Sequence, residues 1–317
     1  MPKLYKASNF KYTPFDNFVD GDLEYLNNNN ITFVDKAKDA DIIISQNLKY
    51  LKPHFWRALF GKKFLIWTIE PRFDTHFTSE VKELFGLIKC HVMNIYTRDV
   101  FVSNVTFFTG IFGEHLHTLP QDFKLKTKKT IALMSYYKGL NSEPLIKNGV
   151  NIDLIGLRSK ICIEGYKLGV VDVFGKGWPD GISKEDSRDG VYFYRKKELM
   201  ADYQFNLCFE NTATHNYMTE KIWDSILTYC LPIYYGKHTN AYELFPENSF
   251  IDYSKFDSPE ALFQFIDNMS DAEYIERINK CITVYNTLCD KREELIKNGR
   301  GKVLENIVAK ANAIVAN

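Results

Sequence analysis

The sequence predicts an α/β fold with two Rossmann-like lobes that follow one another along the chain. Short apolar runs alternate with helical patterns, as in βα units that build a parallel sheet. The apolar runs within ADIIIS (40–45) and FLIW (64–67) are unbroken by polar residues, as expected for strands covered on both faces. The chain has 317 residues, about the length of two domains. A polar stretch at 119–130 interrupts the alternation, so we place the boundary between residues 125 and 126.

Strands and helices are expected in alternation through the first lobe, residues 1–125. The expected strands are the apolar runs at 4–7, 31–35, 40–45 and 63–67. The expected helices are the segments at 16–26 and 53–61.

The alternation continues through the second lobe, residues 126–317. Its expected strands lie at 130–137, 170–175, 205–209 and 231–235. Its expected helices lie at 153–169, 196–204, 219–230 and 259–269. Apolar residues at helical spacing over 271–295 predict a long amphipathic helix that packs against a lobe.

Composition and charge exclude several classes of protein. Forty basic and forty acidic residues give a net charge of zero, so no overall basic field favours nucleic acid. No apolar run reaches the roughly 18 residues of a membrane-spanning helix, and the N-terminus has no secretory signal pattern. The six cysteines are dispersed, as is typical of free thiols in a reducing compartment. We expect a cytoplasmic protein, soluble or loosely peripheral to a membrane.

The densest group of polar residues follows the expected strand at 205–209. A loop holding Glu210, His215 and Asn216 leads to a helix that opens at Thr219, whose hydroxyl is expected to cap it. In open α/β sheets, ligands bind where strands end and helices begin. We therefore expect a ligand at this loop.

A lysine in the first turn of that helix needs an anion. The helix dipole already makes this end positive, so Lys221 is electrostatically unfavourable there. A bound diphosphate would compensate it, and Glu220 would accept hydrogen bonds from sugar hydroxyls. The alternative is that Glu220 and Lys221 are a solvated pair at a helix start.

Two motifs in this region resemble a known family. The segment FENTATHNYMTEK (209–221), followed by a helix and LPIYYG (231–236), resembles the α1,3-fucosyltransferases of glycosyltransferase family ten. The resemblance implies a GT-B fold, in which two Rossmann-like lobes with parallel sheets face each other across a cleft. The first lobe would bind the acceptor, and the second would bind GDP-fucose. Thr212 and Met218 depart from the usual motif.

The resemblance also implies roles for individual residues. Asn211, Tyr217, Glu220 and Lys221 would contact GDP-fucose, with Lys221 at the phosphates. The pattern LRSKICIEGYKLG followed by VDVFGKG makes Arg158 the donor arginine, whose planar guanidinium suits a pyrophosphate.

A general base is implied in the first lobe. The segment FLIWTIEPRFD resembles the family's strand that ends in an acidic residue, so Glu70 would take the proton from the acceptor hydroxyl. Asp74 and Glu80 are reserve candidates for the base, and Lys176 is a minor candidate at the donor.

The implied reaction is the inverting transfer of L-fucose from GDP-fucose to a hydroxyl, most simply O3, of a GlcNAc or glucose unit in an oligosaccharide. No tightly bound cofactor and no essential divalent metal are expected. His115 with His117, and the aspartate pairs at 20 and 22 and at 39 and 41, are weak metal candidates. The alternatives are a GT-B transferase with another sugar nucleotide and a non-catalytic glycan- or nucleotide-binding protein.

Overall fold

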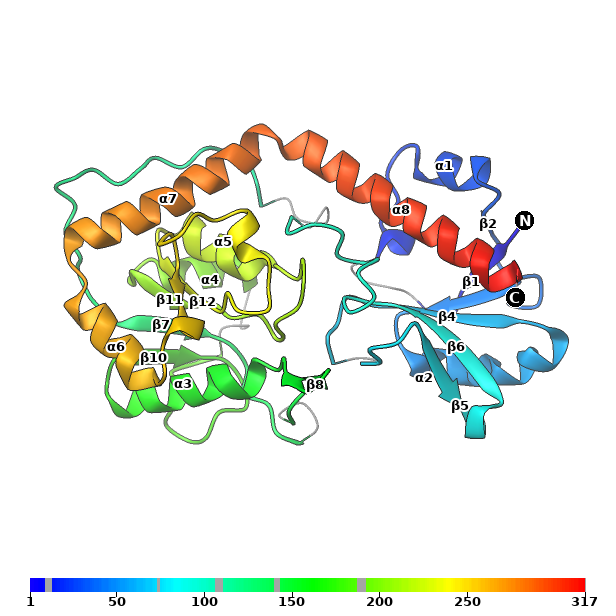
Figure 1. The fold of residues 1–317 in the computed structure, drawn as a ribbon, viewed down its shortest axis with the longest axis horizontal. Coiled ribbons are helices and arrows are strands. Elements are labelled where there is room, and N and C mark those ends of the chain that lie inside the picture. The colour runs from blue at the N-terminus through cyan, green and yellow to red at the C-terminus, as the bar shows by residue number, and fades with distance from the viewer. Residues whose placement is uncertain (9–12, 73–74, 106–110, 140–142, 187–191, 317) are drawn as a thin grey trace. The chain divides into compact units, whose positions relative to one another are not determined.

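The computed structural model describes residues 1–8, 13–72, 75–105, 111–139, 143–186 and 192–316. Two compact units make up the chain (Figure 1). The first unit comprises Met1–Phe108 together with Glu294–Asn317, and the second comprises Thr109–Glu293.

A six-stranded sheet forms the centre of the first unit. The strand order is β2-β1-β3-β4-β6-β5, and only β5 runs antiparallel to its neighbour. The strands are β1 (Lys3–Lys6), β2 (Thr32–Phe33), β3 (Ile42–Ser45), β4 (Lys63–Trp67), β5 (Glu80–Glu83) and β6 (Ile88–Met93). The helices are η1 (Pro14–Asp16), α1 (Asp22–Asn28), α2 (Leu48–Leu51), η2 (Lys52–Phe60), η3 (Leu84–Gly86) and α8 (Arg292–Ala316).

Helices cover both faces of this sheet (Figure 1). On one face, Leu51 of α2 and Phe55 of η2 pack in a cluster with Phe64 and Cys90 of the central strands. Alternate residues of β6 point to opposite faces of the sheet, so His91 lies on the face opposite to Cys90, near Lys310 of α8. Burial lowers the pKa of His91 to about 4, and the positive charge of Lys310 contributes to this shift.

The second unit contains a five-stranded parallel sheet in the order β10-β7-β11-β12-β13. Its strands are β7 (Thr130–Leu133), β10 (Val171–Phe174), β11 (Phe205–Leu207), β12 (Leu231–Tyr234) and β13 (Ile251–Asp252). A separate hairpin joins β8 (Ile146–Lys147) to β9 (Val150–Asn151). The helices are α3 (Ile155–Lys167), α4 (Tyr192–Met200), α5 (Glu220–Leu227), η5 (Ala241–Glu243), η6 (Tyr253–Lys255), α6 (Pro259–Asn268) and α7 (Asp271–Asp290). The predicted α/β class, with a largely parallel sheet in each unit, is confirmed.

The compact units differ from the predicted division at residues 125 and 126. Residues 111–125 belong with the second unit because side chains of α7 bind their backbone. Asn286 accepts a hydrogen bond from the N–H of Leu116 at 2.8 Å, and Asn279 accepts one from the N–H of Leu119 at 2.7 Å. Contacts across 160 residues or more leave no local signal in the sequence.

The C-terminal helix belongs with the first unit rather than with the second lobe. The predicted helix over 271–295 is interrupted at Lys291, which separates α7 from α8. Arg300 of α8 binds Asp22 of the first unit through Nε at 2.8 Å, and both residues are buried. Buried charges are retained when they are paired, so this ion pair fixes α8 to the unit that begins the chain.

Candidate active site

The predicted ligand-binding loop lies at the carboxyl end of β11, in the middle of the second sheet. It is joined to the segment that enters α3. The N–H of Leu154 donates to the carbonyl of Asn211 at 3.1 Å, and the hydroxyl of Thr212 donates to the carbonyl of Ile152 at 2.9 Å. These bonds bring the first turns of α3 and α5, which are far apart in sequence, to the same loop.

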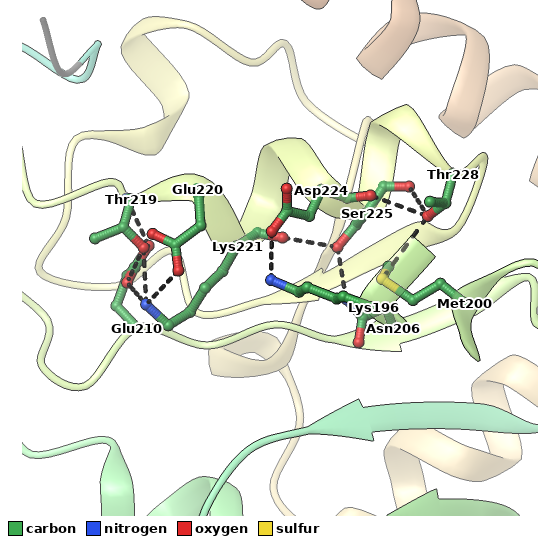
Figure 2. Close-up of polar contacts among 10 residues, drawn as sticks. All are labelled: Lys196, Met200, Asn206, Glu210, Thr219, Glu220, Lys221, Asp224, Ser225 and Thr228. Carbon is green, nitrogen blue, oxygen red and sulfur yellow. Dashed lines mark hydrogen bonds and ion pairs between the residues drawn. The ribbon is translucent and has the colours of Figure 1, made fainter. Parts of the chain in front are cut away.

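A buried carboxylate holds the first turn of α5 in place (Figure 2). Glu210 is only 1% exposed. It accepts hydrogen bonds from the backbone N–H of Thr219 at 2.7 Å and from Nζ of Lys221 at 2.9 Å. The prediction that the Thr219 hydroxyl caps the helix is wrong, because that hydroxyl is bonded to Glu210 and no side-chain cap is formed.

Glu210, a residue of the protein and not a bound diphosphate, is the anion beside Lys221, so the charge of this lysine does not by itself require a ligand. Its carboxylate compensates the lysine from within the protein, and Glu220 Oε1 adds a weaker contact at 3.7 Å. Burial lowers the pKa of Lys221, but the two carboxylates outweigh burial and raise it. Lys221 in turn holds the pKa of Glu220 at about 2. Both groups are therefore charged at neutral pH, and the ammonium is fixed at the loop with part of its surface accessible.

Arg158 is a buried cation without a carboxylate partner within 4 Å in the described ranges. Its side chain is 4% exposed, one Nη donates to the carbonyl of Phe209 at 3.3 Å, and Nε has no hydrogen-bond partner there. Burial lowers its pKa, and Glu210 and Tyr217 oppose that effect from nearby. An unpaired guanidinium in a buried position is costly, and an anionic ligand would offset that cost.

The structure thus brings together four of the five predicted donor residues by contact or by charge interaction. Arg158, Tyr217, Glu220 and Lys221 all interact electrostatically within one group around Glu210. Asn211 lies in the same loop, where its carbonyl is bonded to Leu154.

Glu70 is located in the first unit, just beyond the carboxyl end of β4. It is half-buried, and its backbone N–H donates to the hydroxyl of Thr68 at 3.2 Å. The following turn is fixed by the Tyr96 hydroxyl, which donates to the carbonyl of Pro71 at 3.0 Å. Its position relative to the second unit, and therefore its role as base, stays a prediction.

The reserve candidates differ in position. Asp74 lies outside the described residues. Glu80 is on β5, where its hydrogen bond with Lys89 lowers its pKa. Lys176 is exposed and forms an ion pair with Asp186 at 2.8 Å.

Three of the weak metal candidates have protein partners. His115 Nε2 is 2.8 Å from Asp290, Asp22 is bonded to Arg300, and Asp41 accepts the N–H of Lys3 at 2.9 Å. Within the described residues, no group of three or more histidine, cysteine, aspartate or glutamate side chains is arranged to hold a metal ion.

A second buried ion pair lies on α5, and the sequence did not predict it. Lys196 of α4 binds Asp224, and both side chains are buried (Figure 2). Asn206 of β11 donates to the hydroxyl of Ser225, which donates to the carbonyl of Lys221 at 3.0 Å. These contacts tie α5 to its neighbours one turn beyond Lys221. The two residues of the pair are 28 positions apart on different helices, so no local pattern in the sequence predicts it.

Replacing Lys196 with methionine is expected to lower the free energy of unfolding by about 3–5 kcal/mol, because Asp224 would be left buried and unpaired. Urea unfolding of the variant would measure this. The double variant Lys196→Met/Asp224→Leu should recover most of the loss, and exposed Lys197→Met should change the free energy by less than about 0.5 kcal/mol. Equal losses in the single and double variants would contradict the account of the pair.

Comparison with known proteins finds similarity over the part of the chain that contains this site. The site lies at the carboxyl edge of a parallel sheet, which is where open α/β sheets bind their ligands. Residues 157–279 match the family model of glycosyltransferase family 10 (fucosyltransferase), C-terminal part. The matched segment includes the loop and helix whose motifs resemble this family.

Individual relatives match over shorter stretches. The alpha-(1,3)-fucosyltransferase FucT of Helicobacter pylori is 41% identical over 71 residues, which cover 22% of this chain and 15% of the relative. GDP-fucose protein O-fucosyltransferase 3 of Canis lupus familiaris is 35% identical over 188 residues, 53% of this chain and 38% of the relative. Among solved structures, an alpha1,3-fucosyltransferase aligns with a TM-score of 0.48 and 15% identity, covering 91% of this chain and 89% of that one.

The matched segments span less than two fifths of the curated relatives' own length. Within the described ranges, no helix is both long and apolar enough to cross a membrane.

Proposed function

We propose that this protein transfers L-fucose from GDP-fucose to a hydroxyl of an oligosaccharide acceptor with inversion at the anomeric carbon. The observation that carries the proposal is the pair of fixed cations, Arg158 and Lys221, at the loop after β11. Arg158 is buried without a carboxylate partner in the described structure, as is expected of a residue whose partner is a ligand. The family match and the names of the relatives support fucose as the transferred sugar.

The donor would bind through its diphosphate. Arg158 offers a planar, delocalised charge and Lys221 a compact one, and together they would neutralise the GDP leaving group as the bond to the sugar breaks. Glu220 is ionised and accessible, so it would accept hydrogen bonds from hydroxyls of the ribose or fucose. Asn211 and Tyr217 would orient the donor from the same loop.

Glu70 would act as the general base. Its carboxylate would take the proton of the acceptor hydroxyl while that oxygen forms a bond to C1 of fucose on the face opposite the diphosphate. The C1–O bond to GDP breaks at the same time, and the electron pair leaves with the nucleotide. A diphosphate is a stable anion that needs cations rather than a general acid.

Two acceptor classes have support. The relative from Helicobacter pylori is an alpha-(1,3)-fucosyltransferase, a name that fits transfer to O3 of a sugar, and the protein O-fucosyltransferases favour a hydroxyl on a polypeptide. A transfer assay with labelled GDP-fucose across a glycan array and a set of folded protein acceptors would distinguish them. We expect transfer to the glycans. Label found only on protein acceptors would reject the oligosaccharide assignment.

Removing the Lys221 ammonium is expected to weaken GDP binding by about 10- to 100-fold, because one charge-assisted contact to the phosphates is lost. The single variant Lys221→Met leaves Glu210 unpaired, so the double variant Lys221→Met/Glu210→Gln is the cleaner test. Calorimetric titration with GDP would measure both. Exposed Lys237→Ala is the matched control. Wild-type affinity in the double variant would remove Lys221 from the donor site.

A further inference from the structure

Six large apolar side chains are exposed on two segments of the first unit. They are Trp56, Leu59, Phe60, Leu84, Phe85 and Leu87. Leu59 and Leu87 are 86% and 82% exposed, and Phe85 is fully exposed. We propose that these side chains form a docking surface for an anionic membrane, referred to here as the lipid-facing surface.

The two segments adjoin one another. Phe55 of η2 packs in the same hydrophobic cluster as Val81 and Ile88 of the β5–β6 hairpin. Lys52 at the start of η2 lies 3.8 Å from Glu83 at the end of β5, and Figure 1 shows α2 beside this hairpin. Residues three apart share a face of a 3₁₀-helix, so Phe55 turns toward the cluster while Trp56 and Leu59 turn to solvent.

The hairpin turn presents its apolar residues in an unfavourable backbone conformation. Leu84 and Phe85 have φ values of 48° and 58°, in the left-handed region that suits glycine or asparagine. A turn selected only for stability in water would use those residues. Leucine and phenylalanine here are explained if the turn enters an apolar phase.

The charges around these side chains favour a lipid partner. Between Asp41 and Glu70 the sequence has five basic residues and no acidic one, although the whole chain is neutral. The Arg57 guanidinium lies 4.3 Å from the centre of the Trp56 ring, and the Lys49 ammonium lies 4.6 Å from that of Tyr50. Aromatic rings flanked by basic groups are typical of the membrane interface, and basic residues near it are attracted to anionic headgroups.

The tryptophans provide a direct assay on the whole protein. Of the four, Trp67, Trp178 and Trp223 are buried and Trp56 is 54% exposed. Adding vesicles of phosphatidylcholine with 30% phosphatidylglycerol should shift the fluorescence to shorter wavelength and cause co-sedimentation. Pure phosphatidylcholine should bind about ten-fold more weakly or less. Brominated lipid should quench the shifted emission.

Variants locate the contact. Leu84→Ser/Phe85→Ser/Leu87→Ser should weaken vesicle binding by about ten-fold or more, and Lys62→Ser/Lys63→Ser should do so at low salt. Val19→Ser/Leu23→Ser, which removes exposed apolar residues on and before α1 of the same unit, is the matched control and should bind normally. Absence of vesicle binding, or binding unchanged in the hairpin variant, would overturn the proposal. Self-association without lipid that the hairpin variant abolishes would instead assign this surface to a second copy of the chain.

Discussion

Replacing Glu70 with glutamine is expected to lower the rate of fucose transfer by about 10²–10⁴-fold while leaving GDP affinity within about two-fold of wild type. The amide keeps the size of the side chain but cannot take the proton of the acceptor hydroxyl. Single-turnover transfer from labelled GDP-fucose, with calorimetric titration of GDP, would measure the two effects separately.

Two further variants sharpen this test. Glu80→Gln examines the reserve base, and exposed Glu24→Gln is the control, which should keep full activity. Full activity in Glu70→Gln with loss in Glu80→Gln would move the base to β5. GDP binding without any turnover in the wild-type protein would support the alternative of a non-catalytic nucleotide-binding protein.

Replacing Arg158 with methionine is expected to have opposite effects on binding and on stability. GDP affinity should fall by about 100-fold, since a charge-assisted contact to the diphosphate is worth several kcal/mol in a buried site. The free energy of unfolding without ligand should stay within about 1 kcal/mol of wild type or rise, because an unpaired buried charge is removed and only one neutral acceptor, the carbonyl of Phe209, loses a hydrogen bond.

A loss of GDP affinity without a loss of stability would show that Arg158 acts in binding and not in holding the fold together. Arg158→Lys should recover only part of the affinity, because an ammonium cannot make two parallel hydrogen bonds to a phosphate. Arg277→Met on α7, which breaks an ion pair with Glu273, should leave GDP affinity unchanged. A strong loss of stability in Arg158→Met with normal GDP affinity would make Arg158 a structural residue.

Buried parallel strands were the most predictable part of the fold. Runs such as those at 42–44 and 64–67 are apolar on both faces because helices cover both sides of the sheet. The β5–β6 hairpin was not predicted. Its first strand is the polar segment EVKE at the edge of the sheet, where one face and one side are open to water and the apolar pattern is lost.

The sequence likewise predicted only part of the candidate site. From the lysine at the start of α5 we predicted a bound diphosphate, but Glu210 is the anion beside it. Sequence could not show this, because the loop that brings the two residues together depends on tertiary contacts. Lys196 and Asp224 were missed for the same reason, being 28 residues apart on different helices. Motifs predict which residues form the site, and long-range contacts determine which of them are paired.

The most direct test of the central claim is a donor panel. Purified protein would be assayed for sugar transfer and for nucleotide affinity with GDP-fucose, GDP-mannose and several UDP-sugars, using wild type and Arg158→Met in parallel. We predict turnover with GDP-fucose alone, and loss of GDP affinity in the variant. Turnover with only a UDP-sugar, or GDP affinity that does not depend on Arg158, would contradict the account.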